Sequence, residues 1–419
     1  MIHKEVLDNG LTVVTEETGQ FRSVSLGVWL KTGSRHEPAM LNGISHFIEH
    51  LVFKGTQKRS AREIALIIDS IGGQVDAFTA KEYTCFYTKV LDEHLTVAVD
   101  LLSDIVLRPR FDQQDIEKER RVILEEIRMV EDSPDELVYD VFSEHYWKGH
   151  PMGRPIQGTE RTVSRLTASR LAGHFSGSYK PENIVIAAAG NIRHRSFVRS
   201  MRRAFEPLTP GAVNGRVTMP RSYPVFVRRE KKELEQIHLC VGLPALAMGS
   251  RQRYALLVLN TVLGGTMSSR LWQRIREGSG LAYSVYSAVN SYRDCGFIMV
   301  YAATNPAAAD TVVQQVCEEF ARLKKEPVGE KDLRVAKDHL KGAIMLSLES
   351  TSSRMSNLAR QEIYFGKQFS MDEVLREIEN VSAGQVRALA RKLLVAERSG
   401  LAVVGRLARF KARRPDLEF

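Results

Sequence analysis

The chain has 419 residues, more than one hydrophobic core normally organises, so the sequence predicts two or more domains. Apolar residues make up 43% and charged residues 26%, proportions that exclude a largely disordered chain. The net charge of +9 is spread along the chain without a nucleic-acid-binding motif, and no run of 18 apolar residues occurs. We therefore expect neither nucleic-acid binding nor a membrane span.

The N-terminal residues from Met1 to Leu7 lack the apolar core of a signal peptide, and they run directly into the strand-like residues 11–14. Cysteines occur at positions 85, 240, 295 and 317 without a C-x-x-C pair, which is typical of reduced core residues. Both observations predict a cytoplasmic protein.

Residues 42–56 have the periodicity of one amphipathic helix and contain the pentapeptide His46-Phe47-Ile48-Glu49-His50. This is the H-x-x-E-H signature of inverted zinc peptidases. Residues four apart on a helix lie one turn above each other, so His46 and His50 can direct two imidazoles at one metal ion. Glu49 falls on the same side, where its carboxylate can act as a base toward metal-bound water.

A third ligand is expected from residues 112–132, a long charged segment with helical periodicity. Catalytic zinc usually takes three protein groups and leaves the fourth position to water. The best candidate is Glu126. Glu119, seven residues earlier on nearly the same face, can orient a histidine ligand or the water without binding the metal itself. A glutamate-rich helix taken alone is more often a solvated face with salt bridges.

A stretch rich in proline and glycine between Phe205 and Val225 divides the chain into nearly equal halves. We predict a catalytic zinc-binding domain at 1–212, a linker at 213–222 and a homologous metal-free domain at 223–419. Both halves place a strand-like run before an amphipathic helix, a proline-containing break and another long helix. The pattern favours an α+β fold in which each domain has a mostly antiparallel sheet packed with several helices.

The segments HFIEHLVFKGT and ERRVILEEI, at this spacing, resemble the pitrilysin family of inverted-motif zinc metallopeptidases. The closest likeness is to the branch of the mitochondrial processing peptidase catalytic subunit and its short bacterial homologues. The resemblance implies that His46, His50 and Glu126 bind one Zn²⁺ per chain, that Glu49 is the general base and that Glu119 is a supporting carboxylate. Single-chain pitrilysin relatives have four such domains, so the resemblance also implies a homodimer or a heterodimer with a related subunit, closing a chamber.

The resemblance extends to substrate-binding positions in the first half. Residues 72–80 resemble the edge strand of the family, where an extended substrate adds by main-chain hydrogen bonds, and they include Asp76, Ala77 and Phe78. The family commonly has asparagine where this chain has Asp76, which alters the expected polar contact to the substrate backbone.

Two further pairs follow from the resemblance. Glu136 and Asp140 match acidic positions that, in the processing peptidase, receive an arginine before the cleaved bond, although acidic residues in a first helical turn also favour the helix dipole. Arg276 and Tyr283 have the spacing of the arginine and tyrosine that family members bring from the second domain to the substrate backbone. Their simpler interpretation is a helix-end cation and a residue that begins a strand.

The sequence therefore predicts a zinc metalloendopeptidase that hydrolyses peptides or unfolded segments in an enclosed chamber. The alternative from another class is a non-catalytic partner subunit that holds substrate for a two-chain processing peptidase. A structural zinc site is a further alternative, but such sites normally close with four ligands rich in cysteine, and no cysteine lies near the motif. Histidine and carboxylate ligands also accept other divalent ions.

Overall fold

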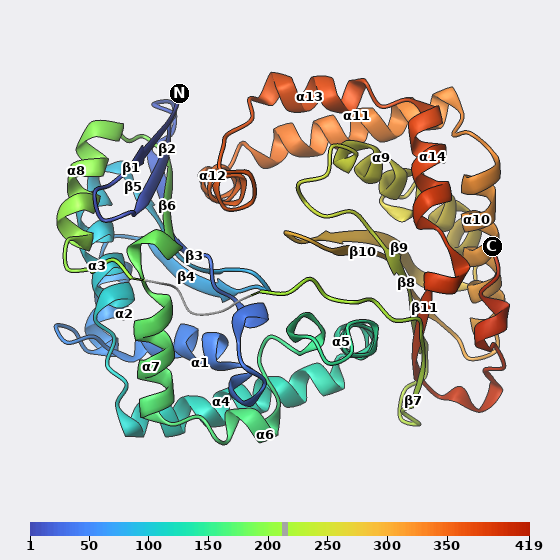
Figure 1. Cartoon of the computed structure of the whole chain (residues 1–419), viewed down its shortest axis with the longest axis horizontal. Coiled ribbons are helices and arrows are strands. Elements are labelled where there is room, and N and C mark those ends of the chain that lie inside the picture. The colour runs from blue at the N-terminus through green and yellow to red at the C-terminus, as the bar shows by residue number, and fades with distance from the viewer. Residues whose placement is uncertain (212–216) are drawn as a thin grey trace. The chain divides into compact units, whose positions relative to one another are not determined.

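The computed structural model describes residues 1–211 and 217–419 and separates by contacts into two compact units (Figure 1). Each unit is discontinuous in sequence. Unit 1 comprises Met1–Arg128, Arg154–Thr218 and Met345–Gln368. Unit 2 comprises Met129–Gly153, Met219–Ile344 and Phe369–Phe419.

Unit 1 is built on a six-stranded sheet with the order β1-β2-β6-β3-β5-β4. Neighbouring strands are antiparallel except for the parallel pair β2 and β6. The strands are β1 (Ile2–Val6), β2 (Thr12–Glu17), β3 (Ser23–Leu30), β4 (Gln74–Thr79), β5 (Thr84–Leu91) and β6 (Ile184–Gly190). Because β4 is the last strand in this order, one of its edges carries backbone groups that no strand of the sheet pairs.

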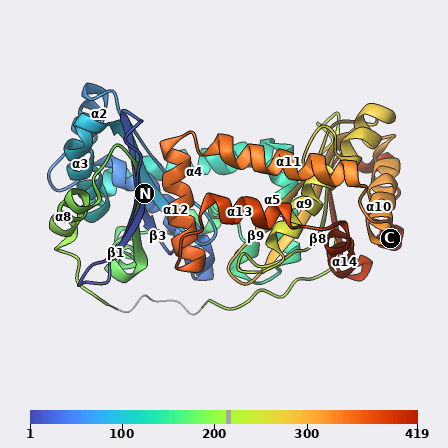
Figure 2. The ribbon, with the colours of Figure 1, turned by 90° about the horizontal axis from the view of Figure 1, so that it is seen from above.

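Helices cover both faces of the unit 1 sheet. They are α1 (Ile44–Leu51), α2 (Ala61–Ser70), α3 (Leu95–Leu107), α4 (Gln113–Asp132), α6 (Glu160–Val163), α7 (Ala168–Ser178), α8 (His194–Phe205) and α12 (Thr351–Phe365). On one face, Leu26, Val28 and Phe86 pack with residues of α1, α3 and α8 in a large core. On the other face, Trp29 and Cys85 pack with residues of α12. Figures 1 and 2 both show α12 beside the strands of unit 1, although it comes from the last fifth of the chain.

Unit 2 has a five-stranded sheet with the order β7-β11-β8-β10-β9, and its parallel pair is β7 and β11. Its strands are β7 (Val225–Glu230), β8 (Ile237–Pro244), β9 (Ala282–Ser291), β10 (Gly296–Thr304) and β11 (Gly400–Gly405). Its helices are α5 (Pro134–Tyr146), α9 (Arg253–Gly264), α10 (Ala309–Lys325), α11 (Glu330–Ser347), α13 (Met371–Glu379) and α14 (Ala383–Leu393). One face of the sheet packs with residues of α9, α10 and α14, and the other with residues of α5.

The two sheets share one plan, because the order β2-β6-β3-β5-β4 repeats as β7-β11-β8-β10-β9 with the same strand directions. The halves also exchange helices. The first half supplies α5 to unit 2, and the second half supplies α12 to unit 1. Both helices bury large side chains: Phe142 of α5 and Met355 of α12 are almost fully buried. Burial of one such side chain contributes about 1.5–3 kcal/mol, so each exchanged helix stabilises its host sheet substantially.

The structure confirms the predicted α+β fold with mostly antiparallel sheets. The predicted division at 213–222 stays a prediction about the two halves, and its residues 213–216 lie outside the described residues. The two compact units do not coincide with the two halves of the sequence, because α5 of the first half belongs to unit 2 and α12 of the second half belongs to unit 1. Among the described helices, none combines the length and the apolar character that crossing a bilayer requires.

Candidate metal centre

Helix α1 presents His46, Glu49 and His50 of the H-x-x-E-H motif on the side away from its buried face. Ile44, Phe47 and Ile48 are buried in the core of unit 1, so the two histidines and the glutamate of the motif point away from that core. The predicted helix over 42–56 is shorter in the structure. It follows Gly43 in a left-handed conformation (φ 93°) and ends at Leu51, after which Val52–Lys54 form a 3₁₀ turn.

Helix α4 brings the predicted third ligand to the two imidazoles. The Oε2 atom of Glu126 lies 3.7 Å from His46 Nε2 and 3.5 Å from His50 Nε2, and one donor atom from each residue lies within 4.8 Å of the others. The histidine rings are 4.7 Å apart between centroids. Residues 76 positions apart in sequence therefore converge, as the motif spacing predicts.

The donor set fits a zinc ion. With Zn–N distances near 2.0–2.1 Å, two donors of a tetrahedral site lie about 3.3 Å apart. The separations of 3.5 and 3.7 Å are close to this value, and two histidines with one glutamate match a catalytic site that keeps a position open. Burial and the neighbouring His50 lower the pKa of His46 to about 4. The imidazole of His46 thus stays neutral, the form that binds metal, well below pH 7.

Glu119 lies behind His50, as expected for a supporting carboxylate. Its Oε2 atom is 3.3 Å from His50 Nδ1, and its side chain is only 7% exposed. This contact favours the tautomer of His50 that carries its proton on Nδ1, so that the Nε2 lone pair on the side of Glu126 is available to a metal ion. In the part of the chain that the structure describes, His46 Nδ1 has no hydrogen-bond partner, so the two histidines are supported differently.

Glu49 is half-buried beside the three ligands, and the hydroxyl of Thr79 donates a hydrogen bond of 2.5 Å to its Oε2 atom. Burial raises the pKa of Glu49, assisted by the charges of Asp76 and Glu126, while the Thr79 hydrogen bond and His50 lower it. A carboxyl group with a raised pKa is a stronger base than an ordinary one once it is ionised. Thr79 thus engages one oxygen of Glu49, and among the described residues the other oxygen has no hydrogen-bond partner.

The predicted substrate strand corresponds to β4, at the edge of the unit 1 sheet and in contact with α1. Asp76 and Phe78 lie on its exposed face and Ala77 is half-buried. Asp76 accepts hydrogen bonds from the Ala77 amide at 2.8 Å and the Tyr87 hydroxyl at 3.3 Å. The aspartate found in place of the usual asparagine therefore has its own partners on the strand, and substrate binding at these three residues stays a prediction.

Arg276 and Tyr283 come together within unit 2. The guanidinium of Arg276 lies 4.1 Å from the Trp272 ring centroid and 5.3 Å from the Tyr283 ring centroid. The pairing of β9 with β10 slips between Ala303 and Thr304, which leaves Tyr283 as the extra residue of a β-bulge with 77% of its surface exposed. Bulges commonly re-aim a side chain next to a site. Arg276 lies in the last turn of the helix Trp272–Gly278 and Tyr283 near the start of β9, as the simpler interpretation also expects.

Glu136 and Asp140 both lie on α5, as predicted, but this helix belongs to unit 2, whereas the metal ligands belong to unit 1. Glu136 is exposed and Asp140 is half-buried. The roles of these two residues, like those of Arg276 and Tyr283, therefore stay predictions.

Sequence reasoning missed two side chains that touch the predicted site residues. Thr79 ends β4, and its contact with Glu49 depends on where the sheet places that strand. Lys54 Nζ forms an ion pair with Glu119 Oε1 at 2.8 Å. Its position four residues after His50 could have indicated this contact, because the chain continues from α1 in a 3₁₀ turn.

Comparisons with known proteins identify the family of the chain and relatives named as zinc proteases. Residues 12–160 match the model of the insulinase family, peptidase family M16, and residues 165–340 match the model of the peptidase M16 inactive domain. The Bacillus subtilis protein named uncharacterized zinc protease YmxG is 43% identical over 95% of this chain and 97% of its own length. The Streptomyces coelicolor protein named uncharacterized zinc protease SCO5738 is 40% identical over 99% of this chain and 91% of its own length.

Solved structures with a similar fold include a protease from Helicobacter pylori, with a TM-score of 0.91, 21% identity and coverage of 97% of this chain and 99% of that chain. A chain of complex III2 from Candida albicans has a TM-score of 0.87 and 19% identity, with both chains fully covered. The level of identity to the zinc proteases, over nearly the whole length, establishes the relationship. This chain belongs to the insulinase or pitrilysin family of zinc metallopeptidases, peptidase family M16.

Proposed function

We propose that the chain is a zinc-dependent metalloendopeptidase in which Glu49 is the general base. The observation that carries the proposal is the convergence of His46, His50 and Glu126 beside a half-buried Glu49 that Thr79 holds. When bound, zinc supplies a Lewis acid that polarises a carbonyl oxygen and acidifies water. Zinc is the expected metal because the relatives are named zinc proteases, and the donors provide for one ion per chain.

In this mechanism Glu49 accepts a proton from the attacking water through the oxygen that Thr79 does not engage. Glu49 then returns the proton to the nitrogen of the leaving amine, so that one carboxylate serves both halves of the reaction. The raised pKa of Glu49 suits this double role, because the group must accept and release a proton near neutral pH.

The free edge of β4 supports an extended peptide or unfolded segment as the substrate. A peptide that adds to this edge pairs its main chain with residues 76–78, in the strand that ends at Thr79. Main-chain pairing reads shape more than sequence, which suits unfolded segments. By the family resemblance, we also infer that two such chains, or this chain and a related subunit, close a chamber that brings Arg276 and Tyr283 to the substrate.

The test compares hydrolysis of a mixed peptide library by the wild type, Glu49→Gln and Glu125→Gln, with zinc content measured in all three. Glu125 is an exposed glutamate next to the ligand Glu126, so it controls for the loss of a carboxylate nearby. We expect Glu49→Gln to keep zinc and to lose cleavage by about 10²–10⁴-fold, and Glu125→Gln to match the wild type. Equal cleavage by the wild type and Glu49→Gln would refute the assigned base. A zinc-loaded wild type that cleaves nothing would favour a substrate-holding subunit instead.

A further inference from the structure

The carboxylate of Glu119 is shared between two donors from one short stretch of chain. Its Oε2 atom faces His50 Nδ1 at 3.3 Å, and its Oε1 atom forms an ion pair with Lys54 Nζ at 2.8 Å. With the side chain 7% exposed, little water reaches these oxygens, so each depends on its protein partner. A carboxylate held at both oxygens is fixed in rotation, whereas one held at a single oxygen can turn about its last bond.

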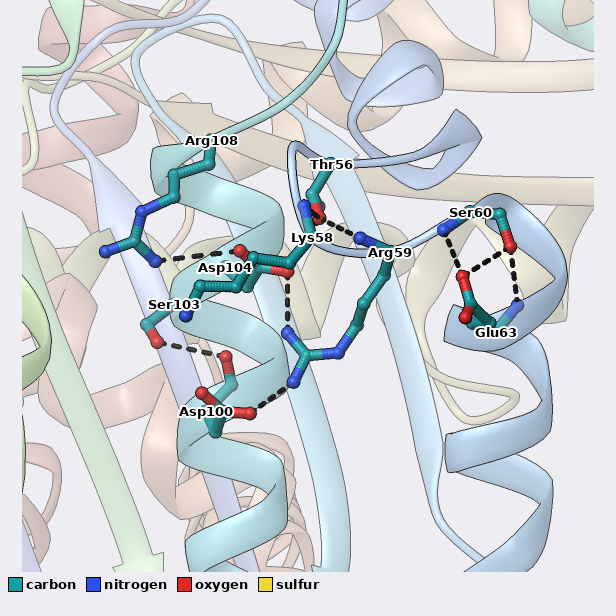
Figure 3. Close-up of polar contacts among 9 residues, drawn as sticks. All are labelled: Thr56, Lys58, Arg59, Ser60, Glu63, Asp100, Ser103, Asp104 and Arg108. Atoms are coloured by element: carbon teal, nitrogen blue, oxygen red, sulfur yellow. Dashed lines mark hydrogen bonds and ion pairs between the residues drawn. The ribbon is translucent and has the colours of Figure 1, made fainter.

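The backbone on the far side of Lys54 is fixed by a polar cluster on α3, drawn in Figure 3. Asp104, fully buried, accepts from the Thr56 hydroxyl at 2.7 Å and from Arg59 Nη1 at 2.6 Å. The intervening Gly55 has φ 134° and accepts from the Arg110 amide at 3.0 Å. Lys54 is therefore anchored by α1 before it and by the Asp104 cluster after it.

We propose that Lys54 is a positioning residue of the metal centre. It holds Glu119 in the one orientation that presents Oε2 to His50, and it thereby fixes the direction of the His50 ring toward the metal. The inference rests on the proposed zinc function. The H-x-x-E-H pentapeptide does not include this lysine, and Lys54 is not one of the three proposed ligands, His46, His50 and Glu126.

Loss of the ammonium group at residue 54 should weaken the retention of zinc more than it weakens the fold. Lys54→Met keeps an unbranched stem of similar reach and leaves Glu119 Oε1 without its ion-pair partner. The freed carboxylate then holds His50 less well, and changes of this kind behind a metal ligand lower affinity by about 10- to 100-fold. Lys54→Arg keeps a positive charge and several donors, so it should restore most of the affinity.

The experiment measures the rate of zinc loss to a chelator in the full-length protein, for the wild type, Lys54→Met, Lys54→Arg and Lys58→Met. Lys58 is an exposed lysine in the same loop, which makes it the matched control. All four are made with Glu49→Gln, so the readout does not depend on cleavage. The melting temperature of each metal-free protein reports on the fold separately.

We expect Lys54→Met to lose zinc at least about 10-fold faster than the wild type, with Lys54→Arg and Lys58→Met within about threefold of it. Metal-free melting temperatures should be similar for the wild type, Lys54→Arg and Lys58→Met, and a few degrees lower for Lys54→Met, because Glu119 Oε1 is then largely buried without its ion-pair partner. Zinc loss from Lys54→Met at the wild-type rate would overturn the assignment of Lys54 and leave the proposed function intact. If the protein with Lys54 and Lys58 unchanged binds no zinc, the proposed function itself is overturned.

Discussion

The buried aspartate of the α3 cluster offers a sharp test of how this chain fixes the loop after its metal-binding helix (Figure 3). Asp104→Asn keeps the shape of the side chain and removes its charge. Asp104 Oδ2 accepts from both Thr56 and Arg59, while Oδ1 lies 3.6 Å from Arg108 Nη1 and has no hydrogen-bond partner among the described residues. If the asparagine oxygen keeps the two donors, its amide nitrogen must face the Arg108 guanidinium, a donor opposite a donor.

The expected loss follows from these contacts. A hydrogen bond to a charged partner contributes about 1.5–3 kcal/mol, and the mismatch with Arg108 adds to its loss. We therefore expect Asp104→Asn to lower the free energy of unfolding by about 2–3 kcal/mol. Asp100→Asn is the matched control, because Asp100 lies on the same helix and binds the other Arg59 nitrogen, yet 56% of its side chain is exposed. Exposed pairs contribute less than about 1 kcal/mol.

Urea unfolding followed by intrinsic fluorescence measures both variants against the wild type under one buffer condition. A loss for Asp104→Asn at least twice that for Asp100→Asn would agree with the contacts. Equal losses, or a loss below about 1 kcal/mol for Asp104→Asn, would refute the reasoning that burial makes the Asp104 contacts dominant.

Two further predictions concern unit 1. Gly27→Ala places a Cβ atom 2.6 Å from both Met355 Sδ and Trp29 Nε1, so urea unfolding should show a loss of about 1–3 kcal/mol. Gly173→Ala, in α7 with nothing within 4 Å, should instead gain about 0.5–1 kcal/mol, and a similar loss in both would contradict the packing explanation. Burial lowers the pKa of His174 from 6.5 to about 4. Between these two pH values the unfolded chain binds more protons at this residue than the folded chain does, so the free energy of unfolding falls as the pH falls. His174→Gln in metal-free protein should reduce this dependence by up to about 1.4 kcal/mol per pH unit, and an unchanged slope would contradict it.

Much of the fold and of the metal centre was readable from the sequence because the relevant signals are local. The strand-like residues 11–14 overlap β2, Thr12–Glu17, in the structure. The ligand helix predicted at 112–132 is Gln113–Asp132. Helix periodicity also placed Glu119 and Glu126 on one face, and both contact the histidines.

The features that the sequence did not reveal are set by tertiary placement. The Thr79 hydroxyl reaches Glu49 only because the sheet order brings β4 beside α1, and strand order is not encoded in any single segment. The helix predicted over 42–56 is shorter because it begins only after Gly43, which has a positive φ, and because the chain tightens after Leu51 into a 3₁₀ turn that ends at Gly55. Likewise, nothing in the patterns of α5 and α12 says which sheet each will cover.

The exchange of α5 and α12 bears on how the protein is made. During synthesis on the ribosome, the β2-β6-β3 surface that carries Trp29 leaves the exit tunnel long before residues 351–365, which cover it. That surface is apolar and is not covered by α12 throughout this interval, a state that is prone to aggregation unless a chaperone shields it. For the same reason, a gene cut between the halves would yield two fragments that each lack part of their own core, and co-expression would be needed to recover either.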